Sequence, residues 1–241
     1  MHAADHLPGT DTALLLLCDH ASAWVPDDIA IPSHLLSLHV GVDIGAGPLT
    51  RALSNALDAP AILGTVSRLV IDLHRQGDHP GLVPMVSDGH AVPGNVGADR
   101  TERIARFHAP YHRAIRQQVR RDHPRLIVAI HSFTPALETG GSPRPWHAGI
   151  LYGRDDRAAR IAIDFLRARG IPTGDQEPYS GRLLNATLDR HADGQGIPSL
   201  SVEIRNDLIA DPAGIAHWCS VLADMIAAVR NGLALNAGPA Q

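Results

Sequence analysis

The stretch ALLLLCDH (Ala13–His20) decides how this sequence folds, because an unbroken apolar run ends there in two polar residues. A run without polar alternation is typical of a strand that is buried on both faces of a sheet. Five further runs rich in Val, Ile and Leu predict strands: Ala61–Leu63, Leu69–Leu73, Leu126–Ile130, Gly149–Tyr152 and Ser199–Ile204. Amphipathic segments separate these runs, so we expect an α/β sheet flanked by helices.

The intervening amphipathic segments predict five helices: Gly47–Leu57, Asp99–Asp122, Asp155–Arg169, Gly181–His191 and Pro212–Asn231. Pro110 should kink or split the longest of them, because proline lacks a backbone N–H. Neither a linker nor a repeat divides the chain, so we expect a single domain over residues 1–241, with flexible ends at 1–12 and 236–241. The Gly- and Pro-rich segment Gly77–Gly97 has no usable period, which is typical of a binding loop.

Composition excludes several classes of protein. All 21 residues in the Lys+Arg count are Arg, so a Schiff-base lysine and a P-loop lysine are both excluded. A net charge of −4 and 4% aromatic residues give no reason to expect nucleic acid as a partner. Cys18 and Cys219 are expected to be reduced core thiols. The longest early apolar run, Ala13–Cys18, is too short to span a membrane, and we expect a cytoplasmic protein that is a monomer or a homodimer.

Polar side chains follow four of the predicted strands. Asp19-His20 and His131-Ser132 come directly after two of them, Asp72 and His74-Arg75 lie at the end of a third, and Glu203 and Arg205 lie at the end of a fourth. In an open α/β sheet, ligands bind outside the carboxyl ends of the strands, where the loops converge. We therefore expect these groups to meet at one edge of the sheet.

This set of groups suits metal-assisted hydrolysis. Two neutral imidazoles and a carboxylate can hold zinc with one position open, and the metal lowers the pKa of a bound water to about 7. A separate Glu can take the proton from that water, and an Arg can stabilise the oxyanion. A second Arg suits a substrate carboxylate, whose two oxygens match the guanidinium fork. The pattern indicates hydrolysis of an N-acyl amino acid.

At these segments the sequence resembles the N-formylglutamate amidohydrolase family, over about residues 14–218. The matching motifs are CDHASAWVP (Cys18–Pro26), HVGVDIGA (His39–Ala46), SRLVIDLHR (Ser67–Arg75), VPGN (Val92–Asn95), FHAPYHRAI (Phe107–Ile115), IHSFTP (Ile130–Pro135) and EIRNDLI (Glu203–Ile209). The family is distantly similar to the zinc carboxypeptidases and aspartoacylase. The resemblance implies a three-layer α/β/α sandwich of the phosphorylase/hydrolase kind, with a mostly parallel or mixed sheet and one zinc ion.

The resemblance also implies roles for individual residues. His20 and His131 correspond to the two histidine ligands, and Glu203 corresponds to the glutamate that activates water. Arg68 would polarise the carbonyl and Arg75 would bind the substrate carboxylate. Asp43 is our candidate for the third ligand, because Ala23 stands where the carboxypeptidases have a Glu. The further residues expected to bind substrate are His74, Asn95, Tyr179 and Arg205. His74 stands where the aspartoacylase pattern has an Asn.

Some roles and functions stay open at the level of sequence. Asp19 could orient a ligand or cap a turn, and Asp72 could form a structural salt bridge or take part in catalysis. His108 and His112 lie four residues apart, but packing or loop contacts are favoured over metal binding because Pro110 lies between them. The same mechanism could act on another N-acyl amino acid or a small peptide. The chain could also be a non-catalytic carboxylate-binding protein or a metal-independent hydrolase, whereas a serine hydrolase would need a Gly-x-Ser-x-Gly elbow that the sequence lacks.

Overall fold

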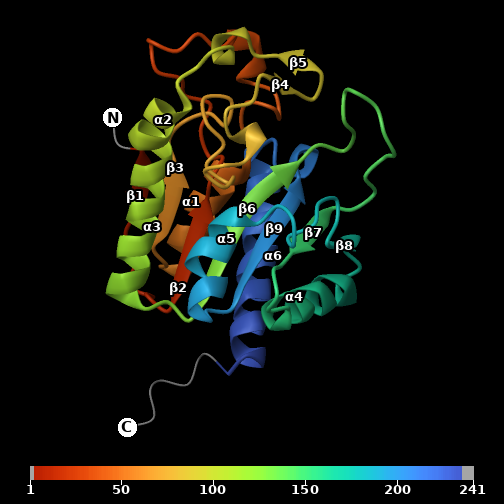
Figure 1. The fold of residues 1–241 in the computed structure, drawn as a ribbon. Coiled ribbons are helices and arrows are strands. Elements are labelled where there is room, and N and C mark those ends of the chain that lie inside the picture. The colour runs from red at the N-terminus through yellow and green to blue at the C-terminus, as the bar shows by residue number, and fades with distance from the viewer. Residues whose placement is uncertain (1–2, 235–241) are drawn as a thin grey trace.

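A seven-stranded mixed sheet forms the middle layer of the computed structural model, which describes residues 3–234. The spatial order is β1-β3-β2-β6-β9-β7-β8 (Figure 1). The strands are β1 (Ala4–Leu7), β2 (Leu14–Cys18), β3 (Ala61–Gly64), β6 (Leu126–Phe133), β7 (Ala148–Leu151), β8 (Thr173–Asp175) and β9 (Ser199–Arg205). Strands β3, β2, β6 and β9 are mutually parallel, while β1 and β7 run antiparallel to their neighbours β3 and β9. A separate two-stranded ribbon pairs β4 (Val86–Ser87) with β5 (His90–Ala91).

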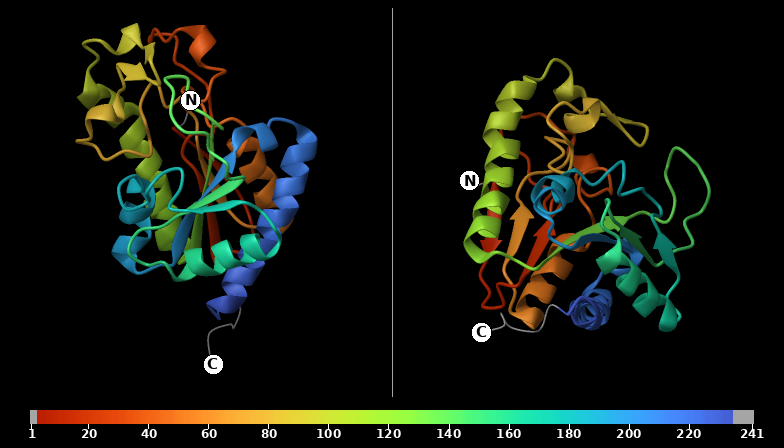
Figure 2. Two further views of the ribbon diagram at one scale, coloured as in Figure 1. Left: turned by 90° about the vertical axis from the view of Figure 1, so that its right-hand side faces the viewer. Right: turned by 60° about the horizontal axis from the view of Figure 1, so that its bottom comes forward.

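Helices cover both faces of the sheet (Figure 2). One face carries α1 (Ala46–Leu57), α4 (Arg157–Ala168) and α6 (Pro212–Gly232), and the other carries α3 (Ala109–Asp122) and α5 (Ala186–His191). The period of two in β2 explains the division, because Leu14, Leu16 and Cys18 pack into the core on the α1–α6 side and Leu15 and Leu17 pack into the core on the α3 side. The expected three-layer α/β/α sandwich with a mixed sheet is confirmed.

Two expectations about strands are wrong. Leu69–Leu73 is buried but forms turns rather than a strand, because its backbone binds side chains instead of a neighbouring strand. The N-terminal segment is more ordered than expected, since Ala4–Leu7 pairs along its whole length with β3. Short β8 was not expected at all. The predicted flexible end 236–241 lies outside the described residues.

The helices follow the sequence pattern with two differences. The segment predicted as Asp99–Asp122 contains α2 (Arg100–Arg103), a π-helical turn (Ile104–His108) and α3, so the irregularity falls just before Pro110. Proline cannot donate to the carbonyl four residues earlier, and a wider turn accommodates that loss. The helix predicted as Gly181–His191 begins only at Ala186, and residues 181–185 form turns beside the site.

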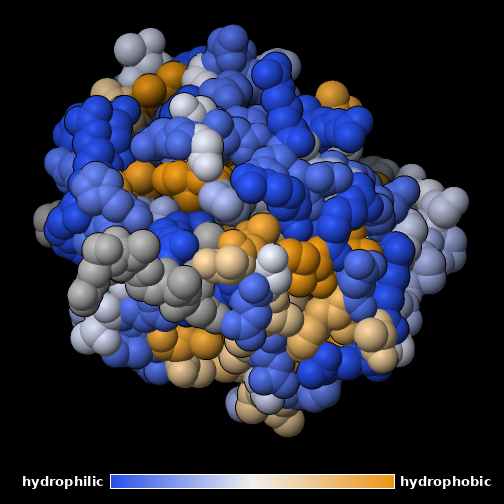
Figure 3. Space-filling view, turned by 90° about the horizontal axis from the view of Figure 1, so that it is seen from below, coloured by the Kyte–Doolittle hydropathy of each residue, from blue (hydrophilic) through white to orange (hydrophobic). Residues whose placement is uncertain are grey.

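Helix α6 is long and apolar, and 28% of its most apolar 18-residue window is buried. Within residues 3–234 it is the one helix with the length and composition to cross a membrane, at a mean hydropathy of 1.3. Its buried residues Trp218, Leu222, Met225, Ile226 and Val229 pack in the core shared with α1 and α4. The end of the molecule seen from below in Figure 1, opposite the carboxyl ends of the parallel strands, shows apolar patches interrupted by hydrophilic residues (Figure 3).

Candidate active site

A polar cavity of about 150 Å³ lies at the carboxyl ends of β2, β6 and β9. Its walls come from those strand ends, the segment after β3 and the turns before α5. The residues that form the walls are His20, Asp43, Arg68, Asp72, His74, Arg75, His131, Ser132, Leu151, Tyr179, Leu184 and Glu203. All three expected metal ligands and both expected catalytic residues are therefore at one place, although they are spread over 183 positions of the sequence from His20 to Glu203.

Strand register places the central groups. His131 on β6 stands directly opposite Glu203 on β9, so both side chains lie at the same level of the sheet. His20 follows β2, the neighbour of β6 on its other side. Asp43 lies three residues before α1, and its backbone N–H donates to the carbonyl of His20 at 3.1 Å. The topology thus brings two imidazoles and a carboxylate together at one sheet edge.

The Asp43 carboxylate is the centre of the site. Its Oδ2 lies 3.3 Å from Nδ1 of His20 and 2.9 Å from Nδ1 of His131. Arg68 donates from Nη1 to the other oxygen, Oδ1, at 2.9 Å. The three groups that could ligate a metal offer ligand atoms within 4.8 Å of one another. Both histidines therefore direct the same ring nitrogen toward one carboxylate oxygen.

The outer nitrogens of both imidazoles face two further buried carboxylates. His20 Nε2 lies 2.7 Å from Oδ1 of Asp72, and because a carboxylate only accepts, that nitrogen carries the proton. His131 Nε2 lies 3.2 Å from Oδ2 of Asp19, although without the alignment of a hydrogen bond. This is the arrangement in which a carboxylate fixes the tautomer and orientation of a metal-binding histidine. Asp72 and Asp19 are therefore the charged partners of His20 and His131, respectively.

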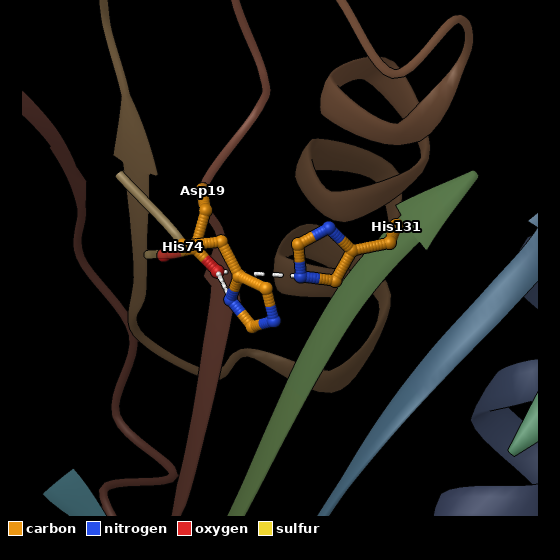
Figure 4. A group of neighbouring side chains, drawn as sticks. All are labelled: Asp19, His74 and His131. Atoms are coloured by element: carbon orange, nitrogen blue, oxygen red, sulfur yellow. Dashed lines mark hydrogen bonds and ion pairs between the residues drawn. The ribbon is translucent and has the colours of Figure 1, made fainter. Parts of the chain in front are cut away.

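Asp19 also binds a third imidazole. Figure 4 shows its carboxylate, at the end of β2, facing the rings of His74 and His131. His74 Nδ1 lies 2.9 Å from Asp19 Oδ2, while His74 Nε2 donates to the carbonyl oxygen of Leu184 at 2.8 Å. Thr187 donates its hydroxyl proton to the other oxygen of Asp19 at 2.9 Å. Asp19, His74 and His131 form a second set of potential metal ligands that shares His131 with the first.

Electrostatics keep the three aspartates charged. Burial alone would raise the pKa of Asp19 and Asp72, but neighbouring histidines, joined at Asp72 by Arg68, hold the pKa of each carboxyl well below its usual range. The pKa of Asp43 is also lowered, because His20 and His131 outweigh burial. Burial by itself would lower the pKa of His131. The neighbouring carboxylates of Asp19 and Asp43 outweigh burial and raise this pKa well above its usual value. The site thus favours positive charge beside Asp43 Oδ2.

These groups fit a zinc ion. Two Nδ1 atoms and a carboxylate are a donor set that zinc takes in catalytic sites with three protein ligands. Three buried aspartates face two guanidinium groups, Arg68 and Arg75, so the imidazoles, or a cation bound between them, must supply the remaining positive charge. His20, Asp43 and His131 are the residues that would hold the ion, and Asp72 and Asp19 would orient the two histidines.

Glu203 lies at the side of this centre, and one of its two carboxyl oxygens, Oε2, has no hydrogen-bond partner among the described residues. The residue is 7% exposed. Burial raises the pKa of Glu203 to about 7, against the lowering by His131. A carboxyl with a pKa near 7 can both take up and release a proton at neutral pH.

The two arginines of the cavity differ in how many of their guanidinium nitrogens are hydrogen-bonded to carboxylates. Arg68 uses both terminal nitrogens, on Asp43 and at 3.2 Å on Asp72. Arg75 contacts Asp72 through Nε at 3.4 Å, and no contact within residues 3–234 engages its terminal nitrogens. Arg75 is thus the guanidinium whose fork is available to a ligand carboxylate. Tyr179 completes the wall, and its hydroxyl accepts from Arg144 at 3.1 Å.

Two residues expected to bind substrate lie away from the cavity walls. Asn95 is buried and donates its amide to the carbonyls of Leu69 and Pro84, at 2.7 and 2.8 Å. Arg205 forms a salt bridge with Asp207 at 2.8 Å. Each side chain has its partners outside the cavity, and a role for either residue in binding substrate stays a prediction. Leu184, which the sequence did not single out, contributes a carbonyl to the site because turns replace the first part of the predicted helix.

A larger open hollow of about 820 Å³ is lined by Arg154, Arg182, Asp189 and Asp193, among others, and shares no lining residue with the cavity above. It is wide and lacks histidine among its lining residues. Its size therefore does not make it the reaction centre, which we place in the smaller cavity that contains the imidazoles.

An α/β sheet with histidines and carboxylates gathered at the carboxyl ends of parallel strands is suited to metal-assisted hydrolysis, and comparison with known proteins places the chain among the amidohydrolases. The family model for N-formylglutamate amidohydrolase matches residues 12–210. The chain belongs to the N-formylglutamate amidohydrolase family, as the motifs predicted.

Solved structures agree on the fold. The gene product Atu2144 from Agrobacterium tumefaciens is 27% identical, with 97% of each chain covered and a TM-score of 0.88. An N-formylglutamate amidohydrolase from Ralstonia eutropha JMP134 is 18% identical, with 97% of this chain and 98% of that chain covered and a TM-score of 0.74. At that identity the likeness establishes the fold. A search of curated proteins found no match.

Proposed function

We propose that this protein is a zinc-dependent amidohydrolase that cleaves the amide bond of an N-acyl amino acid, with N-formylglutamate as the representative substrate. One observation carries the proposal: two imidazole Nδ1 atoms face one oxygen of Asp43, in a cavity whose wall includes Glu203, with its Oε2 atom free of hydrogen bonds to residues 3–234. Family membership supports the amidohydrolase class. The small volume of the cavity favours a single acyl amino acid over a peptide.

Zinc, when bound, would supply Lewis acidity that polarises the acyl carbonyl and lowers the pKa of water to about 7. The residues of the chain do the rest. Glu203 takes the proton from the attacking water, whose oxygen bonds to the acyl carbon. When the C–N bond breaks, Glu203 returns that proton to the leaving nitrogen, and a formyl substrate yields formate and the free amino acid.

The two guanidinium groups have different functions in this proposal. Arg68 is fixed by Asp43 and Asp72 and places a positive charge beside the reacting carbonyl, where an oxyanion develops. Arg75 binds the substrate carboxylate through its free terminal nitrogens. His74, held by Asp19 and Leu184, forms the wall next to Arg75 and limits the size of the bound headgroup.

The test is turnover by the zinc-loaded protein on a panel of N-acyl amino acids that includes N-formyl-L-glutamate, N-acetyl-L-glutamate and N-formyl-L-leucine, with release of the free amine as the readout. We expect hydrolysis that a chelator abolishes and zinc restores. Activity that survives removal of the metal would refute the zinc-dependent mechanism. Elemental analysis of the purified protein measures the stoichiometry, expected to be one zinc per chain.

A further inference from the structure

The segment Leu69–Arg75 enters the cavity wall without belonging to a helix or strand. It is nevertheless buried over most of its length, and a buried carbonyl outside a β-ladder must find another donor. Side chains supply these donors: Asn95 Nδ2 binds the carbonyl of Leu69 at 2.7 Å, Arg103 Nη1 that of Val70 at 2.7 Å, His112 Nε2 that of Leu73 at 3.0 Å and His108 Nε2 that of Arg75 at 2.9 Å.

Short contacts join three buried imidazoles behind the cavity. Nε2 of His112 lies 3.1 Å from Nε2 of His108, and Nδ1 of His112 lies 2.9 Å from Nε2 of His191. A carbonyl oxygen only accepts, so each contact with the carbonyl of Leu73 or Arg75 needs a proton on the Nε2 atom that makes it. The rings of His112 and His191 stack, with centroids 5.2 Å apart. Because their Nε2 atoms are engaged with the main chain, His108 and His112 are not a metal site.

The two carbonyls that receive these bonds flank His74. Its ring lies against Asp19 in the cavity wall, and the next residue, Arg75, carries the free guanidinium fork. The cluster also joins separate parts of the chain, because His108 precedes α3, His112 lies on α3 and His191 ends α5. An imidazole has only two side-chain torsions, so it holds a backbone more rigidly than a long flexible donor does.

We propose that His108, His112 and His191 are positioning residues that hold the backbone of His74 and Arg75 in the geometry needed to bind substrate. They touch neither the cavity nor the groups that would react. Their contribution is to keep the guanidinium of Arg75 at a fixed place relative to Asp43 and Glu203. The link to substrate affinity rests on the proposed function, whereas the link to backbone order does not.

The test compares two substitutions of similar length at one site. His112→Gln retains an N–H that reaches the carbonyl of Leu73, and His112→Met removes it. Val119→Ala is the control, since Val119 is buried on the same helix and packs in the same hydrophobic cluster, but its side chain donates no hydrogen bond to this segment. Amide hydrogen exchange of the metal-loaded protein reports the order of residues 69–76. Steady-state kinetics with N-formyl-L-glutamate report KM and kcat.

We expect His112→Met to speed exchange in residues 69–76 and to raise KM by about tenfold or more, since a misplacement of about 1 Å can cost up to about a hundredfold. His112→Gln should restore both, and Val119→Ala should change neither. Equal exchange in the Met and Gln variants, or the same changes in Val119→Ala, would overturn the proposal.

His108→Met and His108→Gln repeat the comparison at the carbonyl of Arg75 if a position-112 variant does not fold. If the wild-type protein does not hydrolyse N-formyl-L-glutamate, the proposed substrate fails, and hydrogen exchange still decides whether the imidazoles hold this segment.

Discussion

Acid should destabilise this protein through the imidazole cluster behind the cavity. Burial, aided by the positive charge of Arg190, lowers the pKa of His191 to about 4. In the unfolded chain an imidazole has a pKa of about 6.5. Between these values the unfolded chain binds a proton that the folded protein excludes. The stability that His191 contributes is therefore fully present above pH 6.5 and is lost as the pH falls toward 4.

The size of this loss of stability follows from the two pKa values of His191. They differ by about 2.5, and each pKa unit corresponds to about 1.4 kcal/mol, so the free energy of unfolding falls by about 3 kcal/mol between pH 7 and pH 4. That is a large part of the 5–15 kcal/mol that is typical of folded proteins. Burial lowers the pKa of His112 still further, to about 2, so His112 continues the loss at lower pH.

Urea unfolding of metal-stripped wild-type protein and His191→Gln, measured in steps from pH 7 to pH 4, tests this reasoning. The variant is expected to be less stable at pH 7, because it changes the hydrogen bond between His191 and His112, but to lose about 3 kcal/mol less than the wild type on acidification. His217→Gln, at an exposed position of α6, controls for the substitution itself. Parallel losses in wild type and His191→Gln would refute the argument.

Three further predictions concern the cavity. Glu203→Gln should keep its zinc and lower kcat by about 10²- to 10⁴-fold, the range for a general base; elemental analysis with initial rates measures both, and near-normal turnover would contradict the role. Arg75→Met should raise KM for N-formyl-L-glutamate by roughly ten- to a hundredfold, as loss of hydrogen bonds to a charged group predicts, with a smaller change in kcat; an unchanged KM would exclude Arg75 as the carboxylate anchor. Asp19→Asn should weaken zinc binding by about ten- to a hundredfold in competition with a chelator, because Asp19 contacts the outer nitrogen of His131; equal affinities would make Asp19 purely structural.

Much of the fold could be predicted from hydrophobic patterning alone. The runs Ala13–Cys18 and Leu126–Ile130 are apolar throughout, and both became central strands buried on two faces. The run Leu69–Leu73 has the same pattern but forms turns. Apolar composition predicts burial, and burial is correct there, but the donors to its backbone come from residues 95 to 112, whose positions are set only when the chain folds.

The sequence by itself determined which chemical groups gather at the site. Runs that end in Asp19-His20 and His131-Ser132, with Glu203 near the end of another, are sufficient to predict that imidazoles and carboxylates gather at the carboxyl edge of a parallel sheet, because parallel strands place those ends together.

Only the tertiary structure decided how those groups are engaged. The geometry of the folded chain determines that Arg75 has a free guanidinium fork while Arg68 does not. It also determines that Asn95 and Arg205 bind partners outside the cavity, and that Asp19 joins His74 to His131. Hydrogen bonds and ion pairs depend on tenths of an ångström and on angle, and sequence spacing does not specify these.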